Sequence, residues 1–397
     1  MPENIPQITS EEIASLSTVQ EVGFAVLRKW IAMEEISDNN LKRIIAKSLT
    51  FPIPITSVGN YAILELFHGP TMAFKDIAAG VLAQLFEYYL KQEKRTVTIL
   101  VATSGDTGGA IAQAFSGLEK VNVVILYPSG KVSELQEKQL TRVEKNILSI
   151  AVEGDFDACQ AFVKRAFQDK DLLPLHLSTA NSINIGRLLP QIIYYAWAYR
   201  QLQHPNLQFV IPSGNMGNAT AALLAKKMGL PIDSLIIATN ENDVAVEYYK
   251  TGIYQSKKTQ QTLSTAMDIG NPSNFERILD LVHHDYEAFR QVITAIKISD
   301  AQTVATMKKV YKKNKYLLDF HTAVGFCAAE RFTKSDIQTV VVSTAAPEKF
   351  AKEIVETTGI VVDNSQSLAT LRKKEKHVLH AKNDYVVIKK LLLNHSL

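Results

Sequence analysis

Lys75 stands in a short run of residues that could carry covalent chemistry, His68-Gly69-Pro70-Thr71-Met72-Ala73-Phe74-Lys75-Asp76. A Gly-Pro turn precedes the lysine, and apolar residues at helical spacing follow it as far as Leu90. Lys75 is therefore predicted near a helix N-terminus, where the positive end of the helix macrodipole disfavours an ammonium ion. An amine in that position suits condensation with an aldehyde. The alternative for any single lysine is an exposed side chain without a role.

A glycine-rich loop, Thr103-Ser104-Gly105-Asp106-Thr107-Gly108-Gly109, follows a predicted strand and opens a predicted helix. Glycines let backbone N–H groups approach a ligand closely, and a helix N-terminus favours an anion. The hydroxyl groups of Ser104 and Thr107 add further donors, so we expect this loop to bind a carboxylate. Glycine turns between strand and helix are also common, so the loop alone is compatible with a structural role.

A second loop, Ser213-Gly214-Asn215-Met216-Gly217-Asn218, also joins a predicted strand to a predicted helix. Its two glycines and flanking asparagines predict a cup of amide donors. The loop is not a Walker A motif, because no Gly-Lys-Ser/Thr follows, and it lacks the G-x-G-x-x-G pattern. A bound phosphate group therefore fits better than a nucleotide, with an ordinary helix-capping turn as the structural alternative.

A third segment, Asn181-Ser182-Ile183-Asn184-Ile185-Gly186-Arg187, lies at the start of a helix predicted over 185–202. Arg187 could bind an anion in bidentate fashion, although an N-cap followed by a surface arginine would give the same pattern. One lysine, one carboxylate-type loop and two phosphate-type sites together suggest pyridoxal 5'-phosphate as the cofactor. They also suggest a phosphorylated amino acid as the substrate.

The composition is that of a soluble globular protein long enough for two domains, with 397 residues, 46% hydrophobic and 21% charged, and a net charge of +3. This balance argues against nucleic acid and membrane partners, and the basic cluster Arg372–Lys376 is predicted to be solvated. No apolar run approaches the ~18 residues that span a bilayer. Cys159 and Cys327 lack metal-ligand spacing, so we expect buried cysteines inside helices, no metal, and a reducing cytoplasm.

Strands alternate with helices through most of the chain after a helical segment over residues 1–57. The predicted strands share apolar runs bounded by turn residues, and they cover 61–67, 96–103, 121–127, 147–152, 207–211, 235–239 and 339–343. This alternation predicts an α/β fold with parallel sheets covered on both faces. We expect a small lobe over 78–203 and a large lobe formed by 58–77 and 204–397.

In order along the chain, these motifs resemble the threonine synthase family of fold-type-II, tryptophan synthase β-like, pyridoxal-phosphate enzymes. The segments that carry the resemblance are 66–76, 103–108, 155–160, 178–184, 212–218 and 343–350, within a likeness that runs from about Thr9 to His395. The resemblance implies two parallel-sheet lobes with a helical N-terminal segment, in a chain that begins later than typical members. Ala346 stands where many relatives have histidine, and Asp319-Phe320-His321 replaces an acidic-Pro-His run.

The family resemblance implies a role for each matching residue. Lys75 would form the Schiff base with the cofactor and move protons at the substrate Cα and Cβ. Asp106 would contact the cofactor ring and Thr344 would lie beside its pyridine nitrogen. The cofactor phosphate would bind in the cup formed by Gly214, Asn215, Met216, Gly217 and Asn218. Ser104 and Thr107 would bind the substrate carboxylate, and the substrate phosphate would be bound by Asn181, Ser182 and Arg187.

The implied activity converts O-phospho-L-homoserine and water to L-threonine and phosphate by γ-elimination and β-addition, in a monomer or homodimer. One alternative keeps the cofactor and stops after elimination, as a phospholyase that releases 2-oxobutyrate, ammonia and phosphate. A second alternative is a pyridoxal-phosphate-binding protein without turnover. A third is a dehydratase or sulfhydrylase of the same fold, which the phosphate-type residues around Arg187 disfavour.

Overall fold

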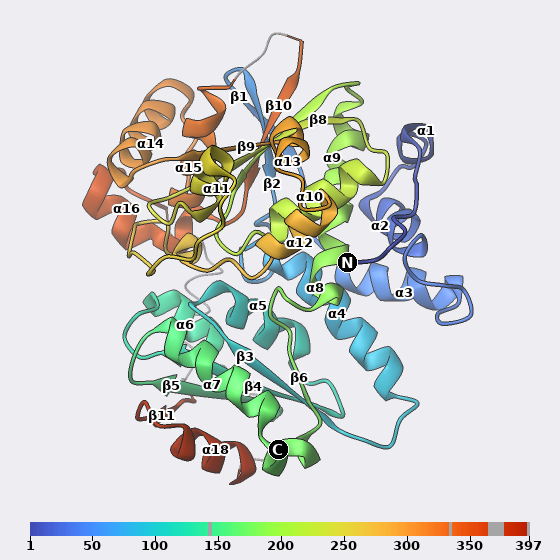
Figure 1. Cartoon of the computed structure of the whole chain (residues 1–397), viewed down its shortest axis with the longest axis vertical. Helices are drawn as coiled ribbons and strands as arrows, with labels where there is room; N and C mark the ends of the chain where they lie inside the picture. The colour runs from blue at the N-terminus through green and yellow to red at the C-terminus, as the bar shows by residue number, and fades with distance from the viewer. Residues whose placement is uncertain (142–144, 333–335, 364–376, 395–397) are drawn as a thin grey trace. The chain divides into compact units, whose positions relative to one another are not determined.

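The computed structural model describes residues 1–141, 145–332, 336–363 and 377–394 (Figure 1). The basic cluster Arg372–Lys376 lies outside the described residues. Internal contacts divide the chain into two compact units. Unit 1 comprises Met1–Phe74 and Leu188–Val362, and unit 2 comprises Lys75–Arg187 and Asp363–Leu397.

Unit 1 is built on a six-stranded sheet in which only the β1–β2 pair is antiparallel. In spatial order its strands are β1 (Ile55–Val58), β2 (Tyr61–Glu65), β10 (Gln338–Ser343), β7 (Leu207–Pro212), β8 (Ile232–Thr239) and β9 (Ile293–Lys297). Every residue of β7 is buried. That explains why the central strands read as continuous apolar runs rather than as alternating patterns.

Helices cover both faces of the unit 1 sheet (Figure 1). On one face, Val210, Ile236 and Val341 pack against α14 (Asp300–Asn314) and α15 (Phe320–Ala329) in one apolar cluster. On the other face α10 contacts β7 and β8, and α9 packs on α10. The helices of this unit not yet given bounds are α1 (Ser10–Ala14), α2 (Val19–Arg28), α3 (Asp38–Ser48), α9 (Ile192–Leu202), α10 (Gly217–Lys227), α11 (Val244–Thr251), α12 (Phe275–Leu281), α13 (Tyr286–Val292) and α16 (Ala351–Thr358). Short 3-10 turns complete it: η2 (Leu189–Gln191), η3 (Thr265–Met267) and η4 (Pro347–Phe350).

Unit 2 contains an all-parallel sheet whose two faces are buried under different helices. In spatial order its strands are β11 (Leu379–Ala381), β5 (Ile147–Val152), β4 (Val121–Pro128), β3 (Val97–Ala102) and β6 (Leu177–Ser178). Because side chains alternate along a strand, Ile99 and Val101 face one cluster, while Leu100 and Ala102 face the other. The first cluster includes α4 (Lys75–Leu90), α5 (Asp106–Phe115) and α6 (Glu134–Leu140), and the second includes α7 (Phe156–Gln168) and α18 (Tyr385–Asn394).

The expected helix over 185–202 is wrong as a single element. The chain forms α8 (Ile185–Leu188), then η2, and then α9, because Pro190 has no N–H to donate and stands at the start of η2. The 3-10 helix η1 (Lys170–Leu175) is a further short element, in unit 2. The seven predicted strands are confirmed within a few residues at their ends, whereas β1, β6, β9 and β11 are short or lie at or near sheet edges.

The units differ from the expected lobes at their boundaries. Unit 2 spans 75–187 rather than 78–203, and it also takes residues from 363 onward, which were expected in the large lobe. The physical reason for the second difference is that β11 pairs with β5, and α18 packs on α7. No local pattern reveals those long-range contacts. Residues 1–57 are part of unit 1 rather than a separate segment.

Both cysteines are buried without a disulfide inside helices, Cys159 in α7 and Cys327 in α15, as predicted. Within the described ranges, no helix is long and apolar enough to cross a bilayer.

Each sheet has a topological switch point at which neighbouring strands connect in opposite directions. In unit 1 the chain leaves β7 toward β8 and β9, and β10 is added on the other side of β7. In unit 2 the chain leaves β3 toward β4 and β5, and β6 is added on the other side of β3. Parallel α/β sheets bind ligands outside the carboxyl ends of the strands at such points. The loops that follow β7, β10, β3 and β6 are therefore the first places to look for a site.

Candidate active site

Lys75 is the first residue of α4, and its amine is paired with a buried carboxylate of unit 2. Its Nζ lies 3.2 Å from Asp106 Oδ2, and its side chain is 15% exposed. Asp106 opens α5, directly after the glycine loop. Its other oxygen, Oδ1, accepts a hydrogen bond of 3.0 Å from Nε2 of Gln136. The prediction that Lys75 lies at a helix N-terminus is confirmed. The structure also places the Lys75 amine beside the Asp106 carboxylate.

The loop after β3 is kept in a tight turn by one hydroxyl group. Thr103 Oγ1 accepts hydrogen bonds from the N–H groups of Gly105 and Gly108, at 3.0 and 2.9 Å. A Cβ at Gly108 would come within 2.3 Å of a Leu140 methyl group, so the loop requires glycine there. The hydroxyl groups of Ser104 and Thr107 are half-buried and have no hydrogen-bond partner in the described part of the chain. They remain available to a carboxylate.

The segment after β6 lies beside this loop, because β6 is the parallel neighbour of β3. Asn181 Nδ2 donates to the carbonyl oxygen of Ala102, the last residue of β3, at 2.8 Å. Arg187 is 3% exposed, and its Nη1 donates to Ala180 O at 2.6 Å. Ser182 lies half-buried in the same segment. The structure therefore brings the predicted carboxylate loop and the predicted substrate-phosphate segment to the same edge of one sheet.

The residues just before Lys75 are clamped to the segment that contains Thr344. Phe74 N–H donates to Thr344 O at 2.9 Å, and Ala346 N–H donates to Met72 O at 3.1 Å. Ala73 and Ala345 form an isolated antiparallel bridge between these two hydrogen bonds. Met72 adopts φ +57°, an unusual value for a residue other than glycine, which the clamp must maintain.

A buried lysine completes this clamp. Lys349 is 2% exposed, and its Nζ donates to Thr71 O at 3.0 Å. Sequence analysis missed this residue, because a lysine six residues after a strand and three after Ala346 gives no sign of burial. Ala346, the position that departs from the family pattern, is itself buried and joined to Met72 only through backbone.

The loop after β7 presents a row of donors at the N-terminus of α10. In the described part of the chain, the backbone N–H groups of Gly214 to Asn218 have no hydrogen-bond acceptor. Met216 adopts φ +62° as the residue before α10, which turns successive N–H groups toward one point. A Cβ at Gly214 would lie 2.7 Å from Met267 Cα, so only glycine allows the wall of this cup to approach so closely.

Asn218 is fixed by two tyrosines of α9 that sequence analysis did not identify. Its Oδ1 accepts hydrogen bonds from the hydroxyl groups of Tyr194 and Tyr195, at 2.7 and 2.5 Å. The amide is therefore oriented with its nitrogen away from both tyrosines, and Nδ2 is a buried donor without a partner among the described residues. An unsatisfied buried donor is costly, so its position at the cup fits a site built for an anion such as a phosphate group.

Thr344 follows β10, the neighbour of β7, and is 6% exposed. Its hydroxyl group has no hydrogen-bond partner within the described ranges. Both Thr344 and the cup over 214–218 thus lie at the switch point of the unit 1 sheet, as expected for residues that hold one ligand between them.

His321 is a buried, structural residue behind the cup. Its Nδ1 lies 2.8 Å from Asp319 Oδ1, and its Nε2 accepts from the N–H of Ala266 at 3.2 Å. Accepting at Nε2 requires the neutral imidazole with its proton on Nδ1. Ala266 belongs to the same turn as Met267, which packs against Gly214. Nearby, burial raises the pKa of Asp268 to about 6.

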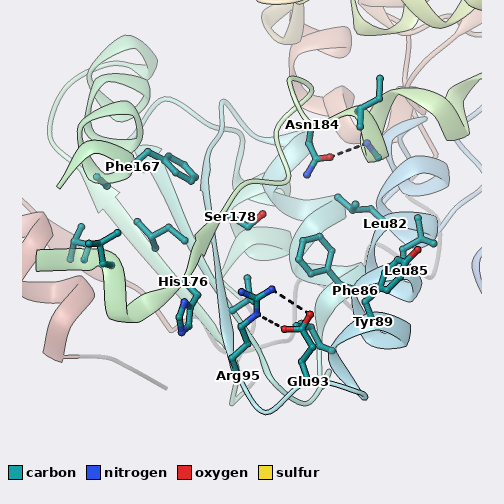
Figure 2. Close-up of a pocket in the computed structure, with 18 of the residues that line it drawn as sticks. Leu82, Leu85, Phe86, Tyr89, Glu93, Arg95, Phe167, His176, Ser178 and Asn184 are labelled. Carbon is teal, nitrogen blue, oxygen red and sulfur yellow. Dashed lines mark hydrogen bonds and ion pairs between the residues drawn. The ribbon is translucent and has the colours of Figure 1, made fainter. Parts of the chain in front are cut away.

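A separate cavity of about 700 Å³ opens in unit 2 between α4, β6 and the end of α7 (Figure 2). Its wall is largely apolar, including Leu82, Phe86 and Phe167, with Glu93 and Arg95 paired at the rim. None of the predicted site residues lines it, so it is not the active-site candidate.

Sequence analysis also missed Gln136. Ser133 and Gln136 have the spacing of a capping box, and the structure contains that box at the start of α6. The spacing could have predicted the cap. Nothing in it predicts that the same amide reaches Asp106, since the contact joins residues thirty positions apart.

Comparisons with known proteins identify the family to which the chain belongs. Residues 55–346 match the pyridoxal-phosphate dependent enzyme family, and residues 322–392 match the C-terminal family of threonine synthase. The chain is 39% identical to threonine synthase from Escherichia coli K12, over 100% of this chain and 93% of that protein. It is 37% identical to threonine synthase from Saccharomyces cerevisiae, over 96% of this chain and 90% of that protein. The crystal structure of pyridoxal-phosphate-bound threonine synthase from Brucella melitensis superposes with a TM-score of 0.94 at 35% identity, covering 100% of this chain and 93% of that one.

Proposed function

The chain belongs to the pyridoxal-phosphate dependent enzyme family, and we propose that it converts O-phospho-L-homoserine and water to L-threonine and phosphate. The observation that carries the proposal is the amine of Lys75 at the start of α4, 3.2 Å from the buried Asp106 carboxylate. A lysine at a helix N-terminus is suited to reacting with an aldehyde, because the macrodipole disfavours its ammonium form, and the fixed carboxylate orients the amine for proton transfer.

The residues present fit pyridoxal phosphate. The row of unpaired N–H groups over 214–218 and the buried donor of Asn218 suit its phosphate group. Thr344 offers a hydroxyl group to the pyridine nitrogen, and such a group cannot protonate that nitrogen strongly. When bound, the cofactor supplies an aldehyde for the Lys75 amine and a ring that accepts electrons from the substrate.

The remaining steps depend on side chains of this chain. Ser104 and Thr107 bind the substrate carboxylate with hydroxyl groups that the protein itself leaves unused. Asn181, Ser182 and Arg187 bind the substrate phosphate, which leaves from Cγ. Lys75 removes protons from Cα and Cβ, and water adds at Cβ. Asp106 orients the Lys75 amine between these transfers.

The proposal is tested by incubating the purified protein with pyridoxal phosphate and O-phospho-L-homoserine and measuring all products. We expect phosphate and L-threonine in equal amounts. Phosphate accompanied by 2-oxobutyrate and ammonia, without threonine, would instead support the phospholyase. A visible absorbance that does not change when substrate is added would support a binding protein without turnover.

The substrate-phosphate assignment is tested by Arg187→Ala. Arg187 lies at the edge of the unit 2 sheet beside Ala180, and the cup over 214–218 lies in unit 1. We therefore expect the KM for O-phospho-L-homoserine to rise at least tenfold, because a charge-assisted bidentate contact is lost. The affinity for pyridoxal phosphate should stay within a factor of about two. Loss of the cofactor instead would show that the two phosphate sites are assigned the wrong way round.

We place the enzyme in the cytoplasm, which fits two buried cysteines without a disulfide. A monomer or homodimer remains our prediction for its assembly.

A further inference from the structure

We propose that Gln136 is a positioning residue that controls the reactivity of the Lys75 amine through the Asp106 carboxylate. The inference rests on the proposed function, because Lys75 must react with the cofactor aldehyde for Gln136 to matter. The three side chains form one continuous hydrogen-bonded row within unit 2, and all of them lie outside the apolar cavity of Figure 2.

The Gln136 amide is fixed at both ends. Its Oε1 accepts a hydrogen bond of 3.1 Å from the N–H of Ser133, and its Nε2 donates to Asp106 Oδ1 at 3.0 Å. The amide cannot turn over, because the Ser133 N–H needs an acceptor. Asp106 Oδ1 is therefore occupied, and Oδ2 is the oxygen turned to Lys75 Nζ.

The glycine loop is shaped to admit this amide. Gly105 adopts φ +137°, and a Cβ built there would lie 2.6 Å from the Gln136 amide. Gln136 and Asp106 are 3% and 4% exposed, so water cannot replace the hydrogen bond between them. A loop that needs both glycine and an unusual φ to receive one side chain indicates that the contact serves more than the cap of α6.

The amide sets how strongly Asp106 stabilises the ammonium form of Lys75. A nearby carboxylate favours the charged amine, and only the neutral amine attacks an aldehyde. The N–H of Gln136 draws charge toward Oδ1 and away from the oxygen beside Lys75. A methionine at position 136 would do the reverse, since it has no N–H to hold charge on Oδ1.

The test compares Gln136→Met with the unaltered chain. Methionine keeps the side-chain length and lacks the N–H that donates to Asp106. Glutamate is unsuitable, because two buried carboxylates about 3 Å apart would share a proton and restore the hydrogen bond. Full-length protein freed of cofactor is mixed with pyridoxal phosphate between pH 6 and pH 10. The rate at which Lys75 becomes covalently bound is followed by absorbance and by borohydride trapping with peptide mapping.

We expect the midpoint of the pH–rate curve to rise by about half a pH unit or more in Gln136→Met, with a rate at pH 7 about threefold lower. Asp106→Asn should move the midpoint in the opposite direction. If Gln136→Met does not fold, Gln136→Leu, which also lacks the donor, should shift the midpoint in the same direction. An unchanged midpoint in whichever position 136 variant folds would overturn the inference.

Ser133→Ala separates positioning from helix stability. It removes the hydroxyl that caps α6 and leaves the amide contact with Asp106. We expect a lower melting temperature and an unchanged midpoint. A shift equal to that of Gln136→Met would show that only the helix matters and would reject the inference. Because no substrate is used, a normal Gln136 effect in a protein that forms no threonine would reject the proposed function alone.

Discussion

The ligand that the cup after β7 can bind depends on the hydrogen-bond donors that line it, and the side-chain nitrogen of Asn218 is one of them. Two tyrosine hydroxyl groups occupy its oxygen, so its nitrogen is the atom left for a ligand. In the structure the amide oxygen lies between the two hydroxyl groups and accepts from both of them.

Asn218→Asp keeps the shape of the side chain and replaces its donor with a carboxylate oxygen. That oxygen would repel a phosphate group in the cup, so we expect affinity for pyridoxal phosphate to fall at least a hundredfold. Fluorescence titration of the cofactor-free protein measures this. The control is the melting temperature without cofactor, since both tyrosines can still donate to the carboxylate. An unchanged dissociation constant would show that Asn218 does not face the cofactor phosphate.

The helix start at Lys75 and the loop that contains Ser104 and Thr107 could be predicted, because strand, glycine turn and helix follow one another locally in the sequence. The role of Asp106 is implied by the family resemblance alone. Gln136, Tyr194 and Lys349 could not be predicted, since each acts through a partner brought near by the fold. Their own surroundings in the sequence are an ordinary capping box, an apolar helix and a turn after a proline.

At the scale of elements, the segment that ends at Lys75 is held by its pairing with the segment after β10. Two backbone hydrogen bonds between 72–74 and 344–346 form the Ala73–Ala345 bridge, and the ammonium group of Lys349 adds a hydrogen bond to Thr71 O. This clamp holds the part of unit 1 that ends directly before Lys75, and it depends on η4, far away in the sequence.

Lys349→Met would leave the buried carbonyl of Thr71 without its ammonium donor. We expect the free energy of unfolding to fall by about 1–3 kcal/mol, the usual cost of an unsatisfied buried acceptor. Urea denaturation measures this, and Lys349→Arg should recover part of the loss because it retains a donor. An exposed lysine, Lys352→Met, is the control and should change stability by less than about 0.5 kcal/mol. If Lys349→Met matches Lys352→Met, the clamp does not need the ammonium group.

The central strands of both sheets could be predicted because burial on two faces requires continuous apolar runs. The prediction of a single helix over 185–202 is wrong at Pro190. The apolar pattern continues there, but proline has no N–H to donate the hydrogen bond of a continuous α-helix. The strand β9 was missed, since Ile293–Lys297 follows α13 without a turn residue between them.

At the scale of the whole molecule, the end of the chain returns to the unit that begins at Lys75. There α18 packs on α7, Tyr385 OH donates to Asp169 Oδ2 at 2.8 Å, and Ile388 is fully buried in the second cluster of unit 2. The sequence predicted a division into two lobes. The sequence analysis placed the C-terminal residues in the large lobe, whereas they belong to unit 2. The contacts between α18 and α7 cannot be recognised from the local sequence.

Ile388→Ala tests which unit the C-terminal helix supports. We expect a cost of about 2–5 kcal/mol for the cavity it creates. Hydrogen exchange followed by peptide mass analysis should show faster exchange in α7 and β5, with β7 and β8 unchanged. Val386→Ala, on the same helix and 68% exposed, is the control. Faster exchange confined to unit 1 would contradict the assignment of α18 to unit 2.

The most direct test of this account is the position of the covalent bond between protein and cofactor. Borohydride reduction of the protein with pyridoxal phosphate, followed by peptide mapping, should place a single reduced label on Lys75. Lys75→Ala should then show neither the label nor threonine formation. A label on another lysine, such as Lys349, or full turnover by Lys75→Ala, would contradict the proposed active site.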